Sequence, residues 1–233
     1  KTHKTIELVS KLIKNGVTKF KCATISECEM VATAGATDVL LAYPAVGPNL
    51  VRFLNIKEAF PKIHWYALFD DLNQLKRMND IAQTRNTNVD FFIDVNVGLN
   101  RTGVELSKVC DFAKDSKGLA NVSLKGLHCY DGHNGISDPK VRFESISNLV
   151  TQKKNLQESL RKLGFDVMVI SGGTPEFPCY EKLSDFYMSP GTLFLQDHGY
   201  QDLFKDMEYT PAACVLSRVI SHPNDDYFTL DCG

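Results

Sequence analysis

The chain has 233 residues, enough for one large α/β domain or for a domain with part of a second. Its 26 basic and 28 acidic residues nearly cancel, which argues against a nucleic-acid partner because such a partner requires a basic face. No apolar run in the sequence approaches the roughly 20 residues that cross a bilayer, and the first residues lack the apolar core of a signal peptide. We therefore expect neither a nucleic-acid nor a membrane partner.

The seven cysteines are scattered along the chain, and no two of them form a C-x-x-C pair. The spacing therefore indicates neither a disulfide framework nor a zinc site. Reduced thiols in a cytoplasmic protein are the simplest interpretation.

Short apolar runs alternate with longer segments of helical periodicity. Strands are predicted at residues 19–25, 39–45, 64–69, 90–96, 123–130, 167–171 and 186–189. Helices are predicted at residues 5–15, 26–35 with Ser26 as the cap, 49–60, from the acidic pair at 70–71, 105–114 and 139–163. This alternation is typical of a parallel sheet with helical crossovers.

A closed barrel of this type has eight strands, each followed by a helix. The chain opens on a helix and shows seven such strands, so we expect the first strand to lie before Lys1. From about residue 206 the pattern changes, because residues 213–221 and 227–231 resemble strands without a helix between them. We predict a (β/α)8 barrel over residues 1–205, lacking its first strand, and a truncated β-rich domain over residues 206–233.

In such a barrel, reactive groups collect where strands end. The candidates at these positions are Lys1, Tyr43, Arg101, Tyr130, Asp131, His133, the run Ser171-Gly172-Gly173-Thr174 and the run Ser189-Pro190-Gly191-Thr192.

The two glycine-containing runs are candidates for a phosphate site. Paired glycines let backbone N–H groups approach a phosphate, and the loops after the last two strands commonly hold one in this fold. Each run is also compatible with an ordinary turn.

Arg101 and Tyr130 are weaker candidates when each is taken alone. Gly98 and Gly103 flank Arg101 in a loop that can direct a cation inward, although an arginine in a loop is commonly just solvated. Tyr130 shares a strand face with His128, and a packed core tyrosine is the alternative.

The opening Lys1-Thr2-His3-Lys4 is either a basic terminus or the position of a reactive lysine. A lysine amine becomes a nucleophile toward carbonyl groups when its surroundings depress its pKa. A lysine, a phosphate cradle and an arginine between them would suit pyridoxal phosphate.

Several motifs, in order along the chain, resemble those of the D-threonine aldolase and D-serine dehydratase family, pyridoxal-phosphate enzymes with a barrel of the alanine racemase N-terminal type. They are Lys1 to Thr5, residues 22–29, 41–47, 97–104 and 126–133, Ser171 to Pro175, and Ser189 to Thr192 with Asp197.

The resemblance implies a role for each matching residue. Lys1 would be the Schiff-base lysine, with Lys4 as the second choice, and Arg101 would approach the phenolate oxygen of the cofactor, with Tyr130 beside its ring. Residues implied to hold the phosphate are Ser171, Gly172, Gly173, Thr174, Gly191 and Thr192. Related racemases carry an arginine where this chain has Ser189, so a protonated pyridine nitrogen would not be enforced here.

The family also carries a C-terminal β domain whose side chains bind a divalent metal in the full-length protein. His198 and Asp202 do not replace those ligands, and we assign no metal site to this chain. The resemblance implies a homodimer and a small D-amino acid as substrate.

The function predicted from the resemblance is aldol cleavage of D-threonine-like β-hydroxy D-amino acids to glycine and an aldehyde. A D-serine dehydratase, an amino-acid racemase and a non-catalytic pyridoxal-phosphate carrier are the alternatives. The strands predicted after residue 206 argue against the carrier, which is usually a barrel alone.

Overall fold

A computed structural model describes residues 3–196 and 198–232. Its centre is a curled parallel sheet in the order β1-β2-β3-β4-β6-β7-β8. The strands are β1 (Lys19–Cys22), β2 (Asp38–Leu41), β3 (His64–Phe69), β4 (Val89–Asn96), β6 (Val122–Cys129), β7 (Met168–Ser171) and β8 (Tyr187–Met188). All seven predicted strands are present, and the barrel-type fold class is confirmed. A two-residue strand that the pattern did not predict, β5 (Val104–Glu105), pairs with the end of β4.

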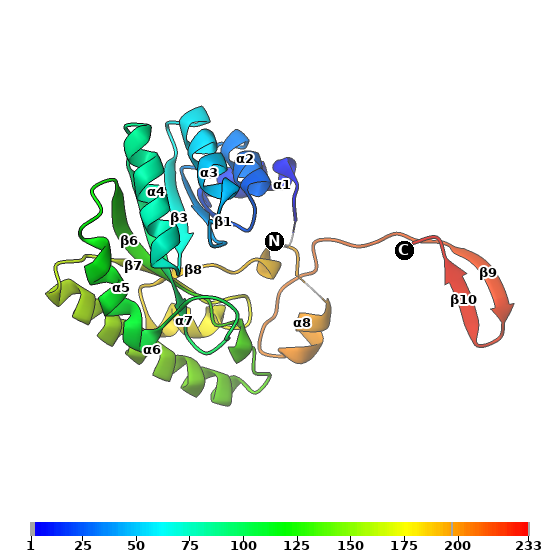
Figure 1. Cartoon of the computed structure of the whole chain (residues 1–233). Helices are drawn as coiled ribbons and strands as arrows, with labels where there is room; N and C mark the ends of the chain where they lie inside the picture. The colour runs from blue at the N-terminus through cyan, green and yellow to red at the C-terminus, as the bar shows by residue number, and fades with distance from the viewer. Residues whose placement is uncertain (1–2, 197, 233) are drawn as a thin grey trace.

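Helices cover the outer face of the curled sheet (Figure 1). They are α1 (Ile6–Lys14), α2 (Ile25–Thr33), α3 (Pro48–Ala59), α4 (Leu72–Thr84), α5 (Val109–Ser116), α6 (Pro139–Lys162) and α7 (Phe177–Leu183). A further helix, α8 (His198–Leu203), lies apart from the strands, before the C-terminal hairpin (Figure 1). The two short helices α7 and α8 were not predicted. No helix among the described residues is long and apolar enough to cross a membrane.

The start of α2 corrects one prediction. Thr24, not Ser26, is the N-cap: its backbone is extended, and its hydroxyl accepts a hydrogen bond from the Glu27 N–H at 3.1 Å. The Glu27 carboxylate in turn accepts from the Ala23 N–H at 2.7 Å. This reciprocal arrangement satisfies two backbone donors at the helix start, which a cap at Ser26 would not.

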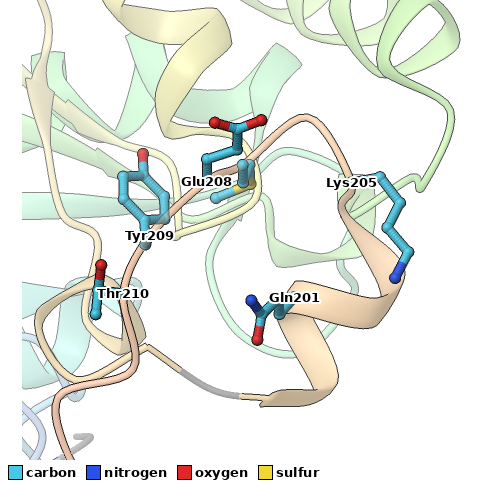
Figure 2. A pocket seen from close by; sticks show the side chains of 6 residues that line it. Gln201, Lys205, Glu208, Tyr209 and Thr210 are labelled. Carbon is cyan, nitrogen blue, oxygen red and sulfur yellow. The ribbon is translucent and has the colours of Figure 1, made fainter.

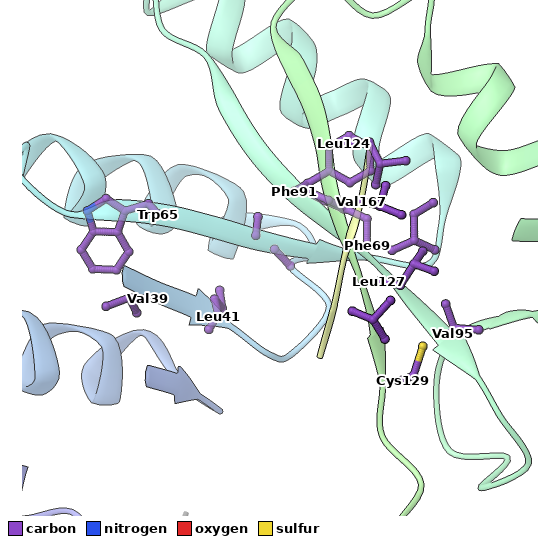
Figure 3. Close-up of a cluster of buried hydrophobic side chains, with 14 of the residues drawn as sticks. Val39, Leu41, Trp65, Phe69, Phe91, Val95, Leu124, Leu127, Cys129 and Val167 are labelled. Carbon is purple, nitrogen blue, oxygen red and sulfur yellow. The ribbon is translucent and has the colours of Figure 1, made fainter. Parts of the chain in front are cut away.

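Two apolar layers follow from the alternation of side chains along the strands. One side of the sheet packs against the helices through residues such as Val39, Trp65, Phe91 and Leu127 (Figure 3). The opposite side carries a smaller cluster of Leu40, Leu68 and Phe92.

Gly126 of β6 faces the Phe92 ring in this inner layer, and a Cβ built there would lie 2.1 Å from that ring. The absence of a side chain at Gly126 therefore makes room for the Phe92 ring inside the barrel.

The edge strands β1 and β8 are linked through side chains. Lys21 Nζ lies 2.8 Å from Ser189 Oγ, directly after β8, and Lys19 Nζ lies 5.0 Å from the centre of the Tyr187 ring. The curl of the sheet therefore brings its first and last described strands to opposite sides of one mouth.

The C-terminal part is a hairpin of β9 (Val219–Asn224) and β10 (Tyr227–Leu230), which extends away from the sheet and its helices (Figure 1). A strand was predicted at residues 213–221, but residues 213–218 are irregular and β9 starts at Val219 and ends at Asn224. Every residue of the hairpin strands is exposed.

Candidate functional site in the barrel mouth

A chain of polar side chains crosses the inner side of the sheet at the carboxyl ends of its strands. Thr102 donates to Asp94 at 2.6 Å, and Asp94 Oδ1 lies 2.7 Å from His128 Nδ1. His128 Nε2 lies 3.3 Å from Lys21 Nζ, which reaches Ser189 on the far edge. These hydrogen-bonded side chains thus join β4, β6, β1 and the segment after β8.

The electrostatics of this row of hydrogen-bonded side chains favour one protonation pattern. Burial and the nearby Lys21 ammonium lower the pKa of His128. Burial of Asp94 opposes its ionisation, but hydrogen bonds from His128 and Thr102 outweigh this and lower the pKa of Asp94. A neutral ring that donates Nδ1–H to the Asp94 carboxylate leaves Nε2 as an acceptor for Lys21. Sequence reasoning placed neither Lys21 nor Asp94 in the site.

Arg101 and Tyr130, two predicted site residues, lie together. The Arg101 guanidinium is 5.0 Å from the centre of the Tyr130 ring, and Lys21 Nζ is 5.2 Å from the same centre. Cations at this distance are attracted to the ring by its quadrupole. Burial and the nearby Glu176 raise the pKa of Tyr130.

The loop after β7 lies against the same ring, since a Cβ built on Gly173 would be 3.7 Å from Tyr130 Cε2. Gly172 has φ +76°, a conformation that favours glycine. Its N–H donates to Asp131 at 3.2 Å, and the Gly173 N–H donates to Glu176 at 2.9 Å. Each of the two backbone donors predicted to hold a phosphate therefore meets a carboxylate.

The two predicted phosphate loops are joined directly. Thr174 Oγ1 accepts from the Leu193 N–H at 3.1 Å, one residue past the Gly191-Thr192 pair. Gly191 and Thr192 are half-buried at the start of a short 3₁₀ turn, Thr192–Phe194. The structure thus places the five implied phosphate-loop residues 172–174, 191 and 192 in one contiguous region.

Ser171 points elsewhere. Its hydroxyl donates to the Cys129 carbonyl at 2.9 Å and lies 2.6 Å from Lys153 Nζ, in a buried cluster. Lys153 also lies 3.0 Å from Asp131, and both residues are fully buried. Tyr180 contacts both partners of this ion pair. Since Asp131 also holds the Gly172 N–H, the cluster fixes the loop from beneath.

Other candidates lie outside the mouth or outside the described residues. Lys1 and Asp197 are not among the residues that the structure describes. Lys4 is exposed and pairs with Glu27 at 2.9 Å. His133 packs against the Gly98 loop, bonded to Asn134 at 2.9 Å.

Two hollows lie near this end of the molecule. Tyr43 is 60% exposed and lines a hollow of about 550 Å³ beside the ends of β1 and β2. A second hollow, of about 510 Å³, lies between α8 and residues 205–210, with Gln201 and Tyr209 on its walls (Figure 2). None of the predicted site residues lines the second hollow. His198 and Asp202 of α8 are 3.4 Å apart and exposed, and no group of metal-ligating side chains occurs among the described residues.

Residues 1–186 match the family model "Alanine racemase, N-terminal domain". The chain belongs to this family. It is 24% identical over 250 aligned positions to a 3-hydroxy-D-aspartate aldolase of Paracoccus denitrificans (strain Pd 1222), covering all of this chain and 63% of the relative. It is also 24% identical to a D-threonine aldolase of Arthrobacter sp, covering all of this chain and 62% of that relative.

Solved structures agree on the fold. A D-threonine aldolase from Filomicrobium marinum superposes with a TM-score of 0.88 at 21% identity, over all of this chain and 64% of that one. A D-threo-3-hydroxyaspartate dehydratase from Delftia sp. HT23 superposes with a TM-score of 0.75 at 16% identity, over 87% of this chain and 54% of that one. The chain therefore spans a little under two thirds of the length of the curated relatives it matches.

Proposed function

We propose that this protein is a pyridoxal-phosphate-dependent lyase that cleaves β-hydroxy D-amino acids to glycine and an aldehyde. The observation that carries the proposal is the contact between the Gly172-Gly173 loop and the Tyr130 ring, with the Arg101 cation over that ring. Two aldolases, for D-threonine and for 3-hydroxy-D-aspartate, are among the relatives of this chain.

The residues of the mouth fit this cofactor. A Cβ built at Gly173 would lie 2.9 Å from Glu176 Oε2 and 3.7 Å from Tyr130 Cε2, so this glycine lets the loop backbone lie close to both groups. Arg101 and Lys21 add positive charge beside an aromatic face, which suits an anionic, planar ligand. We assign the phosphate to the loops at Gly172–Thr174 and Gly191–Thr192, the ring to Tyr130 and Arg101, and the covalent attachment to Lys1.

Bound pyridoxal phosphate supplies an electron sink for charge that develops at the substrate Cα. The protein supplies position and charge. Arg101 and Lys21 attract the anionic groups of cofactor and substrate, and the Asp94–His128–Lys21 chain holds the Lys21 amine at a fixed place in the mouth. In the overall reaction the β-hydroxyl loses its proton, the Cα–Cβ bond breaks, Cα takes up one proton, and glycine and an aldehyde leave.

Dehydration is the second candidate, since a 3-hydroxyaspartate dehydratase shares the fold. The two reactions differ in what leaves Cα: the Cβ fragment in an aldolase, the α-proton in a dehydratase. Incubating the purified protein and pyridoxal phosphate with D-threonine, 3-hydroxy-D-aspartate and D-serine distinguishes them. Glycine is the expected product, ammonia with a keto acid would favour dehydration, and neither product would overturn both candidates.

Matched variants test the assignment of the mouth. Arg101→Ala is expected to lower activity strongly, while Arg77→Ala, an exposed arginine on α4, leaves it unchanged. L-Threonine serves as the stereochemical control. Equal activity of the two arginine variants would contradict the placement of the cofactor.

We further propose that the protein is a homodimer. The exposed apolar side chains of the hairpin, among them Ile220, Tyr227 and Phe228, support this, because such surface is commonly buried by a second subunit or by further chain. Light scattering of the purified protein should give twice the mass of one chain, and a monomer mass would contradict the proposal.

A further inference from the structure

Glu176, in the loop after β7, is a buried carboxylate with one oxygen that has no hydrogen-bond partner among the described residues. Its side chain is fully buried, and Oε2 accepts from the Gly173 N–H at 2.9 Å. Its other oxygen, Oε1, has no hydrogen-bond partner among the described residues. A buried carboxylate oxygen without a partner is costly, which points to a partner that arrives with a ligand.

The groups that face Glu176 come from three directions. Asp131, after β6, is a second carboxylate behind the same loop, and it is paired with Lys153 of α6. Tyr130 lies beside Gly173, and Arg142 of α6 is the nearby cation that acts on Glu176. The Arg142 guanidinium is itself bonded to Asp206 and to the Ile136 carbonyl, so it does not neutralise Glu176 directly.

These surroundings favour the neutral acid. Burial, followed by the charge of Asp131, raises the pKa of Glu176 to about 7, although the Gly173 N–H and Arg142 act in the opposite direction. A phosphate dianion at the same loop would oppose ionisation further, because like charges at close range disfavour each other.

We propose that Glu176 is a phosphate-binding residue that acts as a neutral carboxylic acid, so that binding of a phosphate monoester is coupled to the uptake of one proton. Ionised, Glu176 holds the Gly173 N–H and repels the phosphate. Protonated, it releases that N–H and donates its own O–H to a phosphate oxygen. The inference rests on the proposed function for the identity of the monoester, pyridoxal phosphate.

The coupling predicts a definite pH dependence. With a pKa of about 7, Glu176 is mostly protonated at pH 6, and roughly one molecule in eleven is protonated at pH 8. The affinity for a phosphate monoester should therefore fall roughly tenfold more between pH 6 and pH 8 in the wild type than in a variant with a permanently neutral side chain.

Calorimetric titration of the purified protein tests this. Pyridoxal phosphate, inorganic phosphate and pyridoxal are the three probes, and the proteins are the wild type, Glu176→Gln and Glu181→Gln. Glu181 is an exposed carboxylate on α7, so its variant makes the same change of charge away from the loop. Glu176→Gln should bind both phosphate probes more tightly than the wild type at pH 8 and about equally at pH 6. Glu181→Gln should match the wild type, and pyridoxal should not distinguish the variants.

Each outcome separates the inference from the proposed function. Parallel pH profiles of wild type and Glu176→Gln would overturn the inference, as would no binding of either phosphate probe at both pH values. The expected profile with inorganic phosphate, but no binding of pyridoxal phosphate, would support the inference while contradicting the cofactor assignment.

If Glu176→Gln does not fold, the proton uptake is measured on the wild type alone, by titrating it at pH 8 in two buffers of different ionisation enthalpy. Uptake of about one proton more with pyridoxal phosphate than with pyridoxal supports the coupling, and equal uptake refutes it.

Discussion

Replacing Lys153 by methionine removes the cation from a fully buried ion pair and leaves the Asp131 carboxylate without a charged partner. Lys153 Nζ lies 3.0 Å from Asp131 and 2.6 Å from Ser171 Oγ, and neither member of the pair is exposed. Breaking such a pair by removing one partner costs about 3–5 kcal/mol, because the remaining charge stays buried. We expect the free energy of unfolding to fall by that amount.

Urea denaturation followed by circular dichroism measures the loss. Lys140→Met is the matched control, since Lys140 is an exposed lysine on the same helix, and its change should stay within about 0.5 kcal/mol. Adding Asp131→Asn to the Lys153 variant removes the orphaned charge and should recover most of the stability. Equal losses in Lys153→Met and Lys140→Met would refute the view that this pair supports the loop.

Three further predictions concern single residues. Thr24→Ala should lower the free energy of unfolding by about 1 kcal/mol and Ser26→Ala by much less, because only Thr24 caps α2; equal effects would contradict the cap. Arg101→Ala should weaken binding of pyridoxal phosphate by roughly 10- to 100-fold, in line with the loss of one charged hydrogen bond, and an unchanged dissociation constant would contradict its placement. His128 should titrate below 6.5 in an NMR experiment. Its unfolded ring takes up a proton near 6.5 and its folded ring does not, so the free energy of unfolding should decrease as the pH falls below that value.

Strands β2, β3, β4 and β6 were predictable because strands inside a parallel sheet are largely buried and therefore read as short apolar runs. The ends of the strands were harder to predict. β1 stops at Cys22 and β2 at Leu41, where the chain turns toward the next helix. The short helices α7 and α8 give too few turns for a periodic pattern to stand out.

The structure brings Arg101, Tyr130 and the glycine loops together in one mouth, and their roles there stay a prediction. Lys153 was missed because α6 carries several lysines and only the tertiary structure buries this one. A signal was present: Lys153 falls on the helical stripe of Ile146, Val150 and Leu160, all buried.

Glu176 and Lys21 were missed for a different reason. Their roles depend on contacts between segments far apart in sequence, such as Lys21 with Ser189 across the mouth. A carboxylate three residues after Gly173, in a loop expected to hold an anion, was the available sign for Glu176.

We propose that this barrel mouth binds pyridoxal phosphate through Lys1. Reducing the protein with borohydride in the presence of the cofactor and mapping its peptides by mass spectrometry tests the claim directly. We expect a phosphopyridoxyl group on Lys1 and its loss from that position in Lys1→Ala. Labelling at another lysine such as Lys21, or no labelling at all, would contradict it.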